Sequence, residues 1–174
     1  MSTGKENKKT NNLLIINGSV LSSETGKIFK SDIVVEDGTI SRISENITAG
    51  DFNKSIFKII DADGLTVCPG FFDMHVHLRE PGREDEEDME SGINSAIRGG
   101  ITSLACMPIT NPVIDTPFLV KYLKMSSHAH DYNIFPVAAI TRNLEGESIT
   151  EFGLLKEAGA AAFSDDGKAA APAS

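Results

Sequence analysis

Residues 71–107 read FFDMHVHLREPGREDEEDMESGINSAIRGGITSLACM, and this stretch decides the fold. It holds an apolar run, a helix-like run and a second apolar run, which is typical of a strand, a crossover helix and a parallel strand. Two further apolar runs follow, YNIFPVAAI from Tyr132 and AAAFS from Ala160. This alternation predicts right-handed crossovers and a parallel sheet.

Helices are expected between these runs, at roughly residues 85–98, 117–127 and 151–158. Thr116 before Pro117 is typical of a helix start, and Gly99, Gly100 and Gly159 stand where a helix end favours left-handed residues. Acids crowd the expected first turns of the first helix, where they complement the helix dipole: Glu84, Asp85, Glu86, Glu87, Asp88 and Glu90.

The part before Pro69 follows a different pattern, with short β-like runs that are broken by turn residues. Asp37-Gly38 lies between two such runs, and this pair suits a two-residue hairpin turn that needs positive φ. Residues 13–69 are therefore expected to form a small antiparallel sheet, and residues 70–168 a separate α/β unit. Residues 1–12 are expected to be a disordered tail and residues 169–174 a low-complexity tail.

Composition excludes several classes of function. The 174 residues carry a formal net charge of −9, so a surface that tracks nucleic-acid phosphates or an anionic membrane is not expected. No apolar run is long enough to cross a bilayer or to serve as a secretory signal. Cys68 and Cys106 lack metal or disulfide spacing, so we expect reduced, packed thiols in a cytoplasmic protein.

The chemistry-bearing residues lie in the first strand of the α/β unit, where the sequence reads DMHVHLREPG from Asp73. Side chains alternate along a strand, so His75 and His77 point to one face and Arg79 follows at the carboxyl end. Two such imidazoles can bind one Zn²⁺. The alternative is a pair of buried histidines satisfied by hydrogen bonds.

A second His-x-His pair provides an internal comparison. His128 and His130 fall at the end of an expected helix, where residues two apart point in different directions and cannot share a metal. We therefore interpret this pair as structural.

Four separated motifs, FFDMHVHLREPG, AIRGGITS, MPITNPVID and AFSDDG, together resemble the zinc-dependent bacterial dihydroorotases of the amidohydrolase superfamily. The resemblance runs from Leu13 to Lys168. It implies a (β/α)₈ barrel, of which about the first half is present, beside a small β-sandwich. It also implies the reversible hydrolysis of dihydroorotate to N-carbamoyl-aspartate in pyrimidine synthesis.

The same resemblance assigns roles to individual residues. His75, His77 and Asp166 correspond to ligands of one or two Zn²⁺ ions, with Asp165 as the alternative carboxylate. Arg79 corresponds to the residue that binds the substrate carboxylate. The alternative is that Arg79 forms a surface salt bridge with the run of acidic residues. His77 is also expected to contact the substrate.

Two departures from the family pattern stand out. Ile109 occupies the place of an asparagine that helps to hold the substrate, and Asn111 is the nearby substitute. The general base is expected beyond Ser174, so no catalytic base is assigned within the chain. We therefore expect this chain alone to be an incomplete fragment, inactive and prone to aggregate through its exposed sheet edges.

Two other functions stay open. One is a non-catalytic partner of aspartate carbamoyltransferase, which the change at Ile109 would suit. The other is a hydrolase of a different cyclic amide, such as a hydantoin or allantoin. Arg79 argues against this function, because those substrates lack a carboxylate for it to bind. A full-length protein is expected to form a homo-oligomer.

Overall fold

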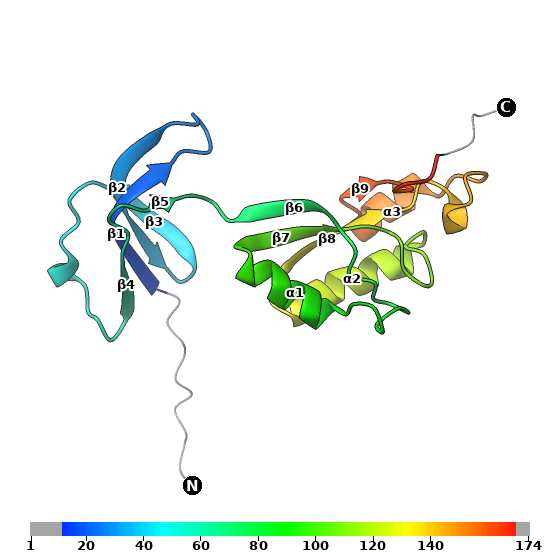
Figure 1. The fold of residues 1–174 in the computed structure, drawn as a ribbon, viewed down its shortest axis with the longest axis horizontal. Helices are drawn as coiled ribbons and strands as arrows, with labels where there is room; N and C mark the ends of the chain where they lie inside the picture. The colour runs from blue at the N-terminus through cyan, green and yellow to red at the C-terminus, as the bar shows by residue number, and fades with distance from the viewer. Residues whose placement is uncertain (1–11, 170–174) are drawn as a thin grey trace, which may run out of the picture. The chain divides into compact units, whose positions relative to one another are not determined.

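The computed structural model describes residues 12–169, and the chain divides between Pro69 and Gly70 into two compact units. Each unit has its own sheet, and in Figure 1 the colour runs from blue to blue-green along the first unit and from green to red along the second. Apart from Asn12 and Ala169, the two predicted tails lie outside the described residues.

The first unit is a five-stranded sheet with the order β3-β2-β1-β4, in which β5 also pairs with β1. Its elements are β1 (Asn12–Leu21), β2 (Ile28–Glu36), β3 (Thr39–Ser44), the 3₁₀ helix η1 (Ala49–Asp51), β4 (Phe57–Asp61) and β5 (Thr66–Val67). Both β4 and β5 run parallel to β1, so the prediction of a purely antiparallel sheet is wrong. The connection through η1 is long enough to bring β4 back in the same direction as β1.

The hairpin between β2 and β3 forms as predicted. Asp37 and Gly38 have φ values of 50° and 78°, the positive values that a two-residue turn of this kind needs.

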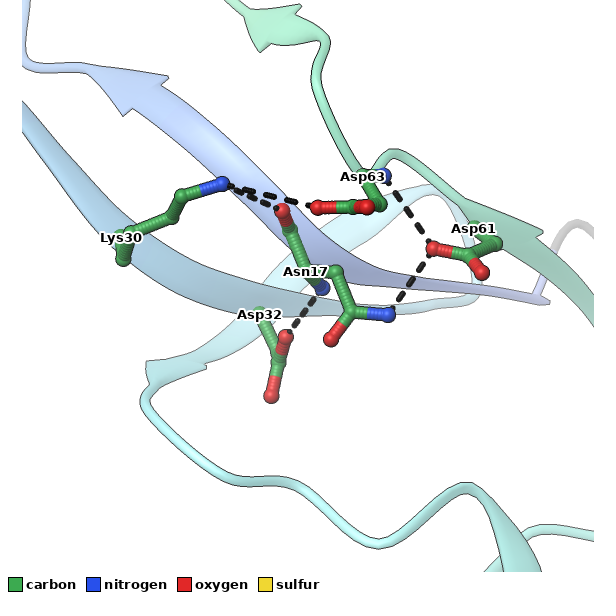
Figure 2. A network of polar contacts seen from close by, with 5 residues as sticks. All are labelled: Asn17, Lys30, Asp32, Asp61 and Asp63. Carbon is green, nitrogen blue, oxygen red and sulfur yellow. Dashed lines mark hydrogen bonds and ion pairs between the residues drawn. The ribbon is translucent and has the colours of Figure 1, made fainter.

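A polar network surrounds a bulge in β1, where the pairing with β2 shifts between Ile15 and Gly18 (Figure 2). Asn17 sits in this bulge with φ 61°, and its N–H donates to the buried Asp32 carboxylate at 2.7 Å. The other oxygen of Asp32 accepts from the N–H of Ile47, also at 2.7 Å. The side-chain amide of Asn17 donates to Asp61 and lowers the pKa of that carboxyl. Asp32, in β2, thus holds both the bulge at Asn17 and the loop segment at Ile47.

The second unit is a parallel sheet with the order β6-β7-β8-β9, which confirms the predicted strand and helix alternation. Its strands are β6 (Phe71–Val76), β7 (Ile101–Cys106), β8 (Asn133–Ala138) and β9 (Ala162–Phe163), and its helices are α1 (Met89–Arg98), α2 (Pro117–Ala129), η2 (Arg142–Leu144) and α3 (Phe152–Ala158). In Figure 1, α1 and α2 cover the same face of this sheet.

The first helix begins later than expected. Asp88 is the N-cap of α1, and its side chain accepts from the N–H of Ser91 while the Ser91 side chain reaches back to the N–H of Asp88. This capping box starts the helix at Met89, so residues 84–87 precede the helix instead of forming its first turn. The bonds from Ser91 lower the pKa of Asp88.

The other helix ends largely follow the sequence pattern. Pro117 occupies the first turn of α2, although the Thr116 side chain makes no capping hydrogen bond. Gly100 and Gly159 have φ of 76° and 107°, as predicted, whereas Gly99 keeps a right-handed conformation. The pair His128 and His130 lies at the end of α2, as expected.

Apolar side chains from the sheet and helices form the main core of the second unit, which includes Leu78, Leu104, Leu123, Ile134 and Leu155. Cys106 lies in this core, and burial raises the pKa of its thiol to about 11. Cys68, in contrast, is exposed, so the prediction of two packed thiols holds for Cys106 alone. Among residues 12–169, no helix is long and apolar enough to span a membrane.

The loops that follow β6 and β7 lie against each other. The N–H of Asn111 donates to the carbonyl of Pro81 at 3.0 Å. Gly82 has φ 91°, and a Cβ at this position would overlap the carbonyl oxygen of Asn111. Glycine is therefore required where the two loops meet.

Asp32→Ala is expected to lower the free energy of unfolding of the first unit by about 1–3 kcal/mol, because two backbone N–H groups lose their acceptor. Amide hydrogen exchange at Asn17 and Ile47 measures this loss locally. Asp63→Ala is the control, since its side chain is 82% exposed and its ion pair with Lys30 is 4.0 Å long. The control should change stability by less than about 0.5 kcal/mol, and equal losses in both variants would contradict the role of Asp32.

Gly82→Ala is expected to destabilise the second unit by at least about 1 kcal/mol, since it combines a positive φ with a clash against Asn111. Urea unfolding followed by tyrosine fluorescence suits the measurement, because both tyrosines, Tyr122 and Tyr132, lie in this unit. The matched control is Gly153→Ala in α3, where a Cβ meets nothing within 4 Å and alanine should stabilise the helix by about 0.5–1 kcal/mol. Destabilisation of both variants to the same extent would argue against the loop contact.

Candidate metal and carboxylate site

Two histidines and one aspartate meet at the carboxyl ends of the outer strands of the parallel sheet. His75 lies in β6, His77 follows the end of that strand, and Asp166 follows β9. Nε2 of His75 is 2.9 Å from Asp166 Oδ1, and Nε2 of His77 is 3.4 Å from Oδ2. The structure thus brings together three residues that the sequence singles out.

Sheet curvature makes this meeting possible. Four neighbouring strands in a flat sheet would hold β6 and β9 about 14 Å apart, at about 4.8 Å per strand. Side chains of histidine and aspartate do not bridge that distance, so the sheet must be concave on the face that carries the histidines. Buried Ala105, Met107 and Val137 form a cluster separate from the main core, and strand alternation places it on the same face.

The three side chains differ in exposure, with 56% for His75, 29% for His77 and 14% for Asp166. Burial lowers the pKa of His77, and the nearby Asp166 carboxylate opposes this shift. Burial therefore favours the neutral imidazole, which is the form that binds metals. Among residues 12–169, Nδ1 of His77 is buried without a hydrogen-bond partner.

The donor set suits a divalent cation. One ligand atom from each of His75, His77 and Asp166 lies within 4.8 Å of the others. Imidazole nitrogen and carboxylate oxygen are ordinary Zn²⁺ ligands, and three protein ligands leave a position for water or substrate. These residues could therefore hold a catalytic metal.

Asp165, the alternative carboxylate, is engaged elsewhere. It is only 3% exposed, and its oxygens accept hydrogen bonds from the N–H groups of Ile140 and Thr141 and from the Thr141 hydroxyl. Asp166 instead has a left-handed backbone, with φ 55°, and faces the histidines.

Arg79 lies in the loop after β6, beyond the two histidines. Its Nε is 3.2 Å from a carboxylate oxygen of Glu86, so the structure contains the salt bridge with the acidic run that the sequence offers as an alternative role. Arg83 pairs with the same glutamate. Arg79 itself adopts φ 58°.

Glu80, to which no sequence motif assigns a role, anchors this loop. One of its oxygens accepts from the N–H of Met89 at 3.0 Å and the other from the Tyr122 hydroxyl at 2.7 Å. Burial, together with Glu80, raises the pKa of Tyr122. The position of Glu80 directly after Arg79 is the one sequence signal that could have drawn attention to it.

The loop after β7 carries the two remaining residues of interest. Asn111 is exposed and touches the Arg79 loop through its backbone bond to Pro81, whereas Ile109 is half-buried. The structure thus places Asn111 beside the loop that holds Arg79.

Comparison with known proteins agrees with this arrangement. Residues 64–174 match the family described as Dihydro-orotase-like. The chain is 46% identical over 157 residues to a dihydroorotase of Ruminiclostridium cellulolyticum, covering 90% of this chain and 36% of that protein. A dihydroorotase of Pelotomaculum thermopropionicum is 46% identical over 156 residues, with coverages of 89% and 35%. The chain thus spans about a third of the length of these relatives.

The fold is similar to that of the L-hydantoinase (dihydropyrimidinase) from Arthrobacter aurescens, with a TM-score of 0.69 and 29% identity. The match covers 87% of this chain and 32% of that protein. The parallel sheet of the second unit is accordingly part of a (β/α) barrel of the amidohydrolase type. Sequence match and fold together show that this chain belongs to the dihydroorotase-like family of amidohydrolases.

Proposed function

We propose that this chain supplies the metal-binding and carboxylate-recognising part of a dihydroorotase site. The reaction is hydrolysis of the ring amide of dihydroorotate to N-carbamoyl-aspartate, and its reverse, in pyrimidine synthesis in the cytoplasm. The observation that carries the proposal is the meeting of His75, His77 and Asp166 at one end of the sheet. The reaction is inferred from the dihydroorotases to which the chain is similar.

In this proposal, His75, His77 and Asp166 hold one or two Zn²⁺ ions. Bound Zn²⁺ polarises an amide carbonyl and makes water nucleophilic near neutral pH. The chain's own contribution is to lower the pKa of His77 through burial, which favours its neutral form, and to hold the Asp166 carboxylate between the two imidazoles. Asp165 is not proposed as a ligand, since its oxygens are taken up by Ile140 and Thr141.

Arg79 is proposed to bind the carboxylate of dihydroorotate, with His77 and Asn111 as further substrate contacts. A guanidinium group forms a planar fork that matches a carboxylate. In this structure the guanidinium of Arg79 pairs with Glu86, so the substrate carboxylate would have to displace that partner. The side chain of Ile109 cannot donate a hydrogen bond, so substrate binding would depend more heavily on Arg79.

Two other functions have specific support. The fold likeness to an L-hydantoinase favours a hydrolase of another cyclic amide, whose substrate would lack the carboxylate. Ile109 in the place of the family's asparagine favours a non-catalytic partner of aspartate carbamoyltransferase. Because the chain alone is expected to be inactive, ligand binding to the Zn²⁺-loaded chain tests the proposal: dihydroorotate should bind, and binding of hydantoin but not of dihydroorotate would overturn it.

Removal of a metal ligand is the first specific test. His75→Ala and Asp166→Ala should each weaken Zn²⁺ binding by at least about 100-fold, measured by competition with a chromogenic chelator on the full chain. His128→Ala is the matched control, because this exposed histidine belongs to the second His-x-His pair and should leave affinity unchanged. Unchanged Zn²⁺ affinity in Asp166→Ala would show that the proposed ligand set is wrong.

The role of Arg79 is tested by its dependence on the ligand's carboxylate. Arg79→Gln should weaken dihydroorotate binding by about 10-fold to 100-fold, since a charged hydrogen bond is worth about 1.5–3 kcal/mol. Calorimetric titration of the Zn²⁺-loaded chain measures this, with uncharged hydantoin as the control ligand. An equal loss of affinity for dihydroorotate and hydantoin would mean that Arg79 does not bind the carboxylate.

A further inference from the structure

We propose that Asp165 is a positioning residue, which fixes the strand ends so that the Asp166 carboxylate reaches His75 and His77. This inference rests on the proposed metal site. It assigns to the first aspartate of the Asp165-Asp166 pair a task different from metal binding.

Asp165 clamps the end of β9 to the segment that follows β8. One carboxylate oxygen accepts from the N–H groups of Ile140 and Thr141 at 2.8 and 2.9 Å, and the other accepts from the Thr141 hydroxyl at 2.5 Å. Asp165 and Thr141 are 3% and 1% exposed. Three donors to one buried carboxylate make a strong, directional connection, because hydrogen bonds to a charged acceptor are stronger than neutral ones.

The backbone pairing in this part of the sheet is short. Within residues 12–169, the ladder between β8 and β9 consists of two pairs, Val137 with Ala162 and Ala138 with Phe163. Beyond them, the N–H of Ser164 donates to the carbonyl of Ala138 at 2.9 Å. The Asp165 side chain therefore continues the connection between the strands where the ladder has ended.

The conformation of Asp166 depends on this connection. Its φ of 55° lies in the left-handed region, which is sparsely populated by residues other than glycine and persists when its surroundings hold it. The N–H of Asp166 donates to the Ser164 hydroxyl at 2.9 Å, and the preceding residue, Asp165, is held through its side chain by the N–H of Ile140. With both tethers in place, the Asp166 side chain points to the two imidazoles.

Thr141 links the clamp to the next loop as well. Its hydroxyl oxygen accepts from the N–H of Gly146 at 2.9 Å while its proton goes to Asp165. An asparagine at position 165 would keep an oxygen for the backbone N–H groups of Ile140 and Thr141 and could donate its amide proton to the threonine hydroxyl. An alanine would keep none of these bonds.

The test measures Zn²⁺ affinity of the full chain for wild type, Asp165→Ala and Asp165→Asn. Alanine should weaken Zn²⁺ binding by about 10-fold to 100-fold, as loss of a residue that orients a metal ligand does. Asparagine should restore the affinity to within about threefold of wild type, since most of the hydrogen bonds can form. Wild-type affinity in Asp165→Ala would overturn the positioning role while leaving the metal site intact.

Asp32→Ala is the matched control, because Asp32 is also a buried carboxylate that accepts from two backbone N–H groups, but it lies in the first unit (Figure 2). It should reduce stability and leave Zn²⁺ affinity within about threefold of wild type, since its hydrogen-bond partners, Asn17 and Ile47, belong to the first unit and not to the metal site. Equal loss of Zn²⁺ affinity in both variants would show that general destabilisation, and not positioning, explains the result.

Imidazole chemical shifts in the metal-free chain provide a second measurement. Asp166→Ala defines the NMR signals of His75 and His77 without the carboxylate, and Asp165→Ala should move both signals towards those values. Unchanged shifts would overturn the positioning role. If wild type binds no Zn²⁺, the proposed function fails, and these shifts still decide the role of Asp165.

Discussion

The parallel pairing of β6, β7, β8 and β9 is the constraint on which the second unit depends. It places the carboxyl end of every strand at one edge of the sheet, so segments far apart in the sequence become neighbours there. His77, Asn111, Thr141 and Asp166 all come from segments that follow a strand. The direction of the strands therefore brings these segments together, and the residue types then determine what the site can bind.

Both units use a buried aspartate to hold irregular backbone in place. Asp32 accepts from the N–H of Asn17, which has φ 61°, and Asp165 precedes Asp166, which has φ 55°. In each case a carboxylate replaces missing backbone partners beside a left-handed residue. The same device stabilises a bulge in one unit and aims a side chain in the other.

Much of the second unit could be predicted from local patterns, because strand alternation places His75 and His77 on one face and glycines mark helix ends. The start of α1 could not, since a row of acids favours several starting points and the Asp88–Ser91 capping box selects one. The direction of β4 depends on the path of a long connection, which no local pattern specifies. Burial of Asp165 arises from contacts with Ile140 and Thr141, far away in the sequence.

Because the sheet is concave, the distance between the ligand atoms of His75 and Asp166 depends on the curvature of its backbone. His75 and Asp166 extend from the two edge strands, so flattening the sheet would separate them before it disturbed either strand. The side chains of Ala105, Met107 and Val137 pack together on this inner face. The packing of residues that bind no ion is therefore one of the factors that set the spacing of the ligand atoms.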